Sequence, residues 1–173
     1  MTEESIAATT VMNARAETVF DLLADPSTHV AIDGTGWVQR PVDVAPLTAT
    51  GQIFRMGMYH DGHPNKTYEM SNRVEVFDRP RAIAWQPGAE PRHIPGRETD
   101  DGPVEWGGWI WRYDLEAVTA DRTEVTLSYD WSQVPPENRD IEFPPFGPEH
   151  LTNSLHHLAE LAAPTSRAST PGG

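Results

Sequence analysis

Residues 109–131 read WIWRYDLEAVTADRTEVTLSYDW, and two runs within this stretch alternate between apolar and polar side chains. In both runs every second residue is apolar: first Trp109, Trp111, Tyr113 and Leu115, then Val125, Leu127, Tyr129 and Trp131. Successive side chains of a strand point to opposite faces of a sheet, so each run predicts a strand with one buried and one solvated face. Two such runs in succession predict antiparallel strands.

The same alternation extends upstream over residues 51–86. In GQIFRMGMYH, residues 51–60, one parity carries Phe54, Met56, Met58 and His60. In KTYEMSNRVEVF, residues 66–77, one parity carries Tyr68, Met70, Asn72, Val74 and Val76, and in AIAWQ, residues 82–86, Ile83 and Trp85 share a face. Turn-forming residues separate these runs, above all DGHPN at 61–65. We therefore predict about five or six antiparallel strands in the middle of the chain.

Helical periodicity flanks these strands. Residues 16–25, AETVFDLLAD, form one apolar stripe from Val19, Phe20, Leu22 and Leu23. Pro26 ends this helix and opens a second short one over PSTHVAID, residues 26–33. Near the C-terminus, residues 149–163 space their apolar side chains as Leu151, Leu155, Leu158 and Ala162. With a first strand at residues 4–11, the fold class is α+β, with a curved antiparallel sheet wrapped around a long C-terminal helix.

The composition fits one folded domain, which we place at residues 4–163 of the 173. The final PTSRASTPGG, residues 164–173, is polar and contains Pro and Gly, so we predict a disordered tail. The 26 acidic and 13 basic residues give a formal net charge of -13, which argues against nucleic acid as a partner. No run approaches the roughly 18 apolar residues of a bilayer-spanning helix, so no membrane insertion is expected.

The absence of Cys excludes disulfides, thiolate nucleophiles and Cys-ligated zinc. The N-terminal MTEESIAATT lacks the basic and apolar regions of a signal peptide, so the expected localisation is cytoplasmic. The sequence carries no indication of the oligomeric state.

Two segments resemble a known superfamily. Residues 11–38, VMNARAETVFDLLADPSTHVAIDGTGWV, and residues 72–86, NRVEVFDRPRAIAWQ, are similar to the opening and to a central hairpin of START/SRPBCC proteins. The resemblance points to the polyketide cyclase/dehydrase and lipid-transport branch. It implies the helix-grip fold of Bet v 1-like proteins and a cavity for a hydrophobic ligand. The superfamily shares no catalytic motif, so the resemblance assigns no catalytic residue.

The parity of the strands and the stripe of the last helix converge on one side of the predicted sheet, where we expect the cavity. The predicted ligand-binding residues are Met56, Met58, Tyr68, Met70, Asn72, Trp85, Trp109, Trp111, Tyr113, Tyr129, Trp131, Leu151 and Leu155. Residues 87–103 hold seven Pro and Gly residues, and we expect them to form a lid at one mouth of the cavity.

Polar groups on the inward parity are the candidates for chemistry. His60 would be a general base, a hydrogen-bond partner of a ligand oxygen, or a structural histidine at a strand end. Asn72 would join Tyr68, Tyr113 and Tyr129 in a polar cluster, or pair its amide with the backbone. The HxxH spacing of His60 and His63 falls in the 61–65 turn, where side chains diverge, so we predict no metal site. No cofactor-binding motif is present.

Three functions remain open at this point. The first is binding of a small hydrophobic molecule, aromatic or polyketide-like, without catalysis. The second is a polyketide cyclase or aromatase type of enzyme without a metal, in which His60, Asn72 and Tyr129 assist enolisation or dehydration. The third is a cochaperone-like interaction domain, which would present an exposed apolar patch instead of a pocket.

Overall fold

The computed structural model describes residues 4–33, 37–59, 66–94, 96–136, 147 and 149–163. Its strands are β1 (Ser5–Met12), β2 (Val38–Pro41), β3 (Ile53–Tyr59), β4 (Thr67–Asp78), β5 (Ala82–Ala89), β6 (Glu105–Trp106), β7 (Ile110–Thr119) and β8 (Arg122–Asp130). Its helices are α1 (Ala16–Leu23), η1 (Pro26–Thr28), α2 (His29–Asp33), η2 (Pro91–His93) and α3 (Glu149–Ala162). Within the described residues, more strands follow α2 than predicted, because β2 and β6 have only four and two residues.

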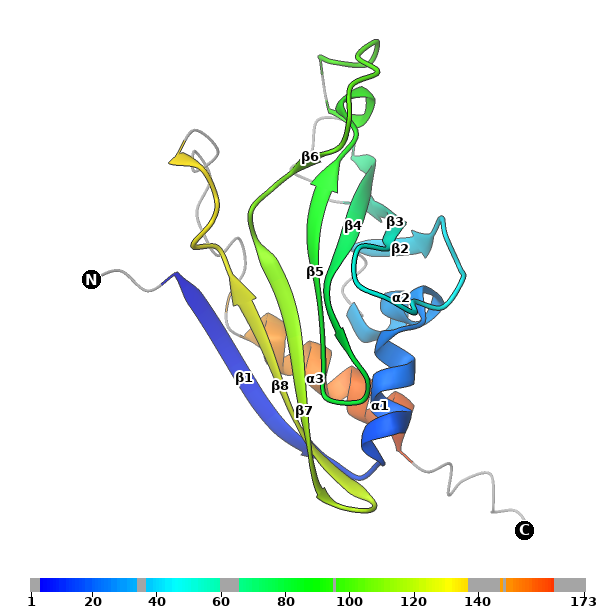
Figure 1. Ribbon diagram of the computed structural model, residues 1–173, viewed down its shortest axis with the longest axis vertical. Coiled ribbons are helices and arrows are strands. Elements are labelled where there is room, and N and C mark those ends of the chain that lie inside the picture. Colours follow the sequence, from blue (N-terminus) through cyan, green and yellow to red (C-terminus); the bar gives the residue numbers. More distant parts are fainter. Residues whose placement is uncertain are drawn as a thin grey trace.

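All strands belong to one antiparallel sheet in the order β1-β8-β7-β5-β4-β3-β2, and β6 pairs with β5. Helix α3 crosses one face of this sheet and contacts α1, α2, β1 and β8 (Figure 1). The short helices α1 and α2 follow the first strand and lie on the same side as α3. This arrangement confirms the predicted α+β fold with a curved sheet and a long C-terminal helix.

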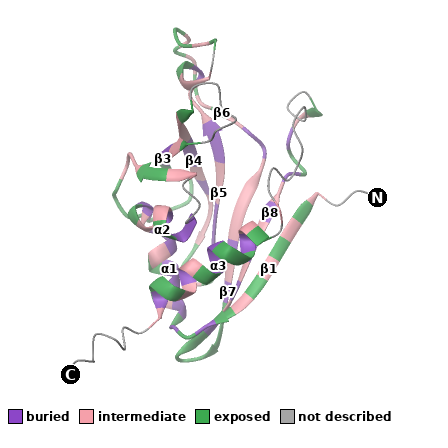
Figure 2. Cartoon of the chain, turned by 180° about the vertical axis from the view of Figure 1, so that it is seen from behind, coloured by how far each residue is buried: buried purple, intermediate pink, exposed green. Residues whose placement is uncertain are grey.

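The core lies between the sheet and these helices. Val19, Phe20 and Leu23 of α1 are fully buried, whereas Leu22 is half-buried at the edge of the stripe. The predicted stripe of α3, formed by Leu151, Leu155, Leu158 and Ala162, is buried too, and Figure 2 shows buried and exposed residues alternating along that helix. In the described part of the chain, no helix combines the length and the apolar character needed to cross a bilayer.

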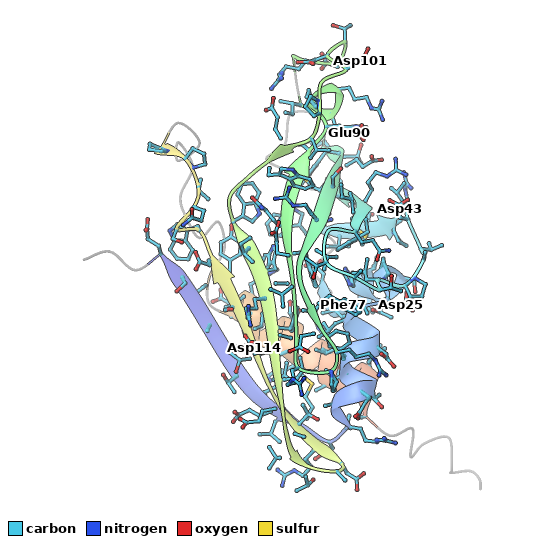
Figure 3. The ribbon with its side chains drawn as sticks, in the orientation of Figure 1. Asp25, Asp43, Phe77, Glu90, Asp101 and Asp114 are labelled. Atoms are coloured by element: carbon cyan, nitrogen blue, oxygen red, sulfur yellow. The ribbon has the colours of Figure 1, made fainter. Side chains whose placement is uncertain are left out.

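A bulge in β4 changes which side chains face the core. Val74 pairs with Trp85, but Val76 pairs with Ala84, so Glu75 is an extra residue in the ladder. A bulge shifts the parity of a strand by one residue. Phe77 accordingly packs against the core in place of Val76 (Figure 3). The predicted inward parity is therefore wrong beyond Val74.

The segment predicted as a lid begins later than expected. Strand β5 continues to Ala89, so residues 87–89 belong to the sheet. The described residues between β5 and β6 extend past the end of the sheet (Figure 1). Within them, Arg97 forms ion pairs of 2.7 Å with Asp100 and 2.8 Å with Glu105. A covering role for this segment stays a prediction.

Gly108 lies where the connection between β6 and β7 approaches the chain after β8. Its φ is +95°, and a Cβ atom there would lie 2.6 Å from the backbone oxygen of Gln133. Gly108→Ala is expected to destabilise the fold by about 2–4 kcal/mol, because strained backbone and overpacking add. Gly96→Ala is the matched control, since Gly96 has a φ of +87° and a Cβ atom there would meet no atom within 4 Å. Urea unfolding measures both variants, and an equal loss in the free energy of unfolding for Gly108→Ala and Gly96→Ala would contradict the close approach to Gln133.

Candidate ligand-binding site

Aromatic side chains form a row across the inner face of the sheet, which is the face toward α2 and α3. Trp85 of β5 pairs with Trp111 of β7, and Trp111 pairs with Tyr129 of β8. The ring centroids of Trp111 and Tyr129 are 4.6 Å apart, and Trp131 lies 5.8 Å from Tyr129. Tyr129 and Trp131 are buried, whereas Trp85 and Trp111 are half-buried although both pack against the core. The row therefore joins the buried core to a part of the inner face that keeps accessible surface.

The predicted ligand-binding residues divide into two groups by burial. The buried group is Met56, Asn72, Tyr113, Tyr129, Trp131, Leu151 and Leu155. The half-buried group is Met58, Tyr68, Met70, Trp85, Trp109 and Trp111. His60, the predicted base, lies outside the described residues, as does the 61–65 turn. Contact of any of these residues with a ligand stays a prediction.

Helix α2 brings a buried histidine against the aromatic row. The ring of His29 stacks on Trp85 at 5.0 Å and meets Phe54 edge-on at 5.4 Å. Its Nε2 donates a hydrogen bond of 2.9 Å to the carbonyl oxygen of Leu23. Burial lowers the pKa of His29 below its ordinary value. The hydrogen bond to Leu23 and the negative charge of Asp25 act in the opposite direction, but burial has the larger effect. His29 is therefore neutral in the folded protein near neutral pH.

This buried histidine predicts a loss of stability on acidification. Because the pKa of His29 is lower in the folded than in the unfolded chain, the unfolded chain binds more protons as the pH falls through about 6.5. The free energy of unfolding then falls with the pH until the pH reaches the folded-state pKa. His29→Phe is expected to flatten this dependence by at most about 1.4 kcal/mol per pH unit. Urea unfolding between pH 5 and 7.5 measures the free energy of unfolding of both proteins. Parallel plots of this free energy against pH would contradict the prediction.

A carboxylate and an imidazole meet where α2 ends and α3 begins. Asp33 Oδ1 lies 4.0 Å from His150 Nε2, and the two side chains are only 8% and 12% exposed. The His150 ring centroid is 5.9 Å from those of Trp37 and Trp111, so this pair adjoins the aromatic row. Burial lowers the pKa of His150, while the charges of Asp33 and Glu149 oppose that shift. The pair combines a buried carboxylate with an imidazole that can accept a proton.

The hydroxyls of Tyr68 and Tyr113 are influenced by the charge of Asp33 and form, with Asp33 and His150, the polar part of the candidate site. Trp37 Nε1 donates a hydrogen bond to the Tyr68 hydroxyl. Burial raises the pKa of Tyr68 and of Tyr113, and the negative charge of Asp33 raises both further. Both phenols therefore keep their protons at neutral pH. They can act as hydrogen-bond donors toward an oxygen atom of a ligand.

Sequence reasoning missed four residues of the candidate site: His29, Asp33, Trp37 and His150. Helix α2 has only five residues, which is too short to show a periodic buried stripe. The available signal was the spacing of His29 and Asp33, because residues four apart share one side of a helix. Both are indeed buried on α2. No spacing in the sequence links α2 with the first turn of α3.

Asn72 has a backbone partner in the structure. Its Nδ2 donates a hydrogen bond of 3.4 Å to the carbonyl oxygen of Phe54, which pairs with it across β3 and β4. This matches the alternative of a buried amide that pairs with the backbone. A contact between Asn72 and a ligand stays a prediction.

The outer face of the sheet has a different chemistry. A partly open groove of about 320 Å³ there is lined by Ile110, Arg112, Ser128, Asp130, Ser132 and Gln133. Ion pairs such as Arg112 with Asp114, at 3.0 Å, run along this face. An aromatic ligand gains little from such a lining, so we place the candidate site on the inner face.

Comparison with known proteins identifies the fold class. No protein-family model matches the chain. The chain is 25% identical over 118 residues to uncharacterized protein Rv0088 of Mycobacterium tuberculosis. That alignment covers 68% of this chain and 43% of the relative, so the chain spans less than half of the relative's length.

Two solved structures are similar over almost the whole chain. Zhui aromatase/cyclase from Streptomyces sp. R1128 superposes with a TM-score of 0.61, at 15% identity and over 98% of both chains. Norcoclaurine synthase from Thalictrum flavum, solved in complex with dopamine and hydroxybenzaldehyde, gives a TM-score of 0.56 at 17% identity, over 91% of this chain and 84% of that one. The chain therefore has the Bet v 1-like helix-grip fold of the START/SRPBCC proteins, as the resemblance implied.

Proposed function

We propose that the protein binds a small, ring-containing hydrophobic molecule between the inner face of the sheet and helices α2 and α3. The observation that carries the proposal is the partial exposure of Trp85 and Trp111. Both side chains contact buried neighbours on the covered face of the sheet. Accessible surface on aromatic side chains of that covered face supports room for a ligand between the sheet and the helices.

The polar group beside the row favours a neutral ligand that carries a hydroxyl or carbonyl group. The buried carboxylate of Asp33 and the net charge of -13 disfavour a ligand carboxylate. The imidazole of His150 and the hydroxyls of Tyr68 and Tyr113 offer both donors and acceptors. Norcoclaurine synthase was solved with dopamine and hydroxybenzaldehyde, two small aromatic molecules with hydroxyl groups, which supports an aromatic, hydroxyl-bearing ligand for this fold.

A neutral naphthol provides the test of this proposal. Calorimetric titration with 2-naphthol is expected to show binding, and Trp111→Ala is expected to weaken it by about 1–2 kcal/mol, or roughly 5–30-fold, through the loss of an aromatic wall. Trp106→Ala is the matched control, because Trp106 lies on the outer face with Arg73 over its ring at 4.5 Å. Absence of binding, or equal losses for both variants, would contradict the proposal.

A second candidate function is proton transfer on such a ligand, and the pair of Asp33 and His150 favours it. A neutral imidazole beside a buried carboxylate is suited to take a proton from carbon or oxygen. The similarity to an aromatase/cyclase supports an enzyme of that type. The third function, a cochaperone-like domain, has less support, because the exposed large apolar side chains of the described residues are spread over β1, the segment before β3, β3, β7 and α3: Val11, Val44, Ile53, Tyr59, Val118 and Leu161.

A further inference from the structure

Three side chains of the types that bind metal ions meet where β4 begins and β5 ends, away from the candidate ligand-binding site. Glu69 belongs to β4 and His93 lies in η2. Glu90, which is labelled in Figure 3, follows β5 directly. One oxygen from each carboxylate and one ring nitrogen of His93 all lie within 4.8 Å of one another. All three residues are half-buried. They therefore form a compact donor set, with one imidazole and two carboxylates.

The register of the sheet explains why the two carboxylates face each other. Ser71 of β4 pairs with Gly88 of β5. Continuing that register by two residues places Glu69 opposite Glu90. Like charges directly opposite each other destabilise a sheet. A cation between the two carboxylates would remove this repulsion.

The distances suit a shared metal ion. His93 Nε2 lies 3.5 Å from Glu69 Oε1 and 4.0 Å from Glu90 Oε1. Two ligands of a tetrahedral zinc ion, each about 2.0–2.1 Å from the metal, are about 3.3 Å apart. The first pair is close to that separation already. The second reaches it when a half-buried side chain moves by less than about 1 Å.

The positive charges around the cluster leave it with an excess of negative charge. Arg92 contacts the other oxygen of Glu90, Oε2, at 3.0 Å, and its side chain is 50% exposed. Arg55 also lies near both carboxylates, but Asp43 holds its guanidinium with bonds of 2.9 Å and 3.0 Å. Glu90 Oε1 and Glu69 Oε1 thus remain directed toward His93.

We propose that Glu69, Glu90 and His93 bind a divalent zinc ion, with water completing the coordination. Imidazole together with carboxylate oxygen is a donor set that zinc accepts in proteins. The ion would tie η2 to β4 and so fix the base of the segment that leads to β6. The proposal departs from the expectation of no metal, because only the pairing of β4 with β5 brings these residues together.

Titration of the metal-free protein with zinc sulfate at pH 7 tests the site. One ion per chain is expected to bind, and His93→Gln and Glu90→Gln are each expected to weaken binding by at least ~10–100-fold. His156→Gln and Glu116→Gln are the controls, because both residues are exposed on other elements. Arg92→Ala is expected to tighten binding, since it frees the carboxylate of Glu90.

Cobalt provides a second readout that does not depend on stability. Co²⁺ bound in place of zinc is expected to give visible absorption that His93→Gln removes and His156→Gln keeps. If zinc binds only weakly and the substitutions His93→Gln and Glu90→Gln do not change that binding, the proposal is overturned. The three residues would then form only an ion-pair cluster. A circular dichroism spectrum equal to that of the unchanged protein would establish that each variant is folded.

Discussion

Phe20→Ala is expected to lower the free energy of unfolding by about 3–5 kcal/mol, the usual cost of removing a fully buried phenylalanine. Phe20 has no exposed surface, and its ring meets Phe77 edge-on with centroids 5.1 Å apart. The contact joins α1 to the bulged end of β4, so the variant leaves a cavity between helix and sheet. For a domain of this size, the loss corresponds to roughly 6–20 °C in Tm.

Urea unfolding with a matched helix variant measures this effect. Leu161→Ala also shortens an apolar side chain in a helix, but Leu161 is 42% exposed. It is expected to change the free energy of unfolding by no more than ~0.5 kcal/mol. The double variant with Phe77→Ala is expected to lose less than the sum of the single variants, because the two rings share one contact. A loss below about 1 kcal/mol for Phe20→Ala would contradict the placement of α1.

His150→Ala is expected to slow enolisation of a bound bicyclic ketone by ~10²–10⁴-fold, if the protein transfers protons. In that reaction His150 takes a proton from the carbon beside the carbonyl, and the electron pair of the broken bond moves to the carbonyl oxygen. Asp33, 4.0 Å away, stabilises the imidazolium that forms. A Tyr68 or Tyr113 hydroxyl donates a hydrogen bond to the enolate oxygen. The imidazolium then exchanges this proton with solvent and returns a proton from solvent to the carbon, which restores the ketone and the neutral imidazole.

The exchange of the α-protons of 2-tetralone for deuterium, followed by NMR, measures this step. His156→Ala is the control on the same helix, because that side chain is exposed. His60→Ala examines the base that the sequence predicted, and a loss confined to that variant would assign the proton transfer to His60. An exchange rate equal to that in buffer would exclude proton transfer on this ketone and would leave the binding proposal intact.

Most of the fold could be predicted because its elements carry long, regular patterns. Strand β8 alternates over its whole length, β7 alternates as far as Leu115, and α3 keeps one apolar stripe along its length. The prediction failed after Val74, where one extra residue shifted the parity and turned Phe77 inward. A bulge has no fixed sequence pattern, so alternation alone could not reveal it.

The candidate site was less predictable, because contacts between distant segments assemble it. The aromatic row follows from strand parity and was predicted from the sequence. Asp33 and His150 meet only when α2 packs against α3, and their polar side chains give no indication of burial beforehand. Glu69 and Glu90 become neighbours through the register of two strands, and each one alone is typical of a solvated surface.

The pairing of the first strand with the last also governs when the chain can fold during synthesis. Each residue of β1 pairs with a residue of β8, for example Met12 with Thr123. A ribosome that adds ~5–20 residues per second needs roughly 5–20 s to make the stretch between these strands. Throughout that time β1 lacks its neighbour, and α3 follows later still. We therefore expect β1 to join the sheet only after β8 has left the ribosome.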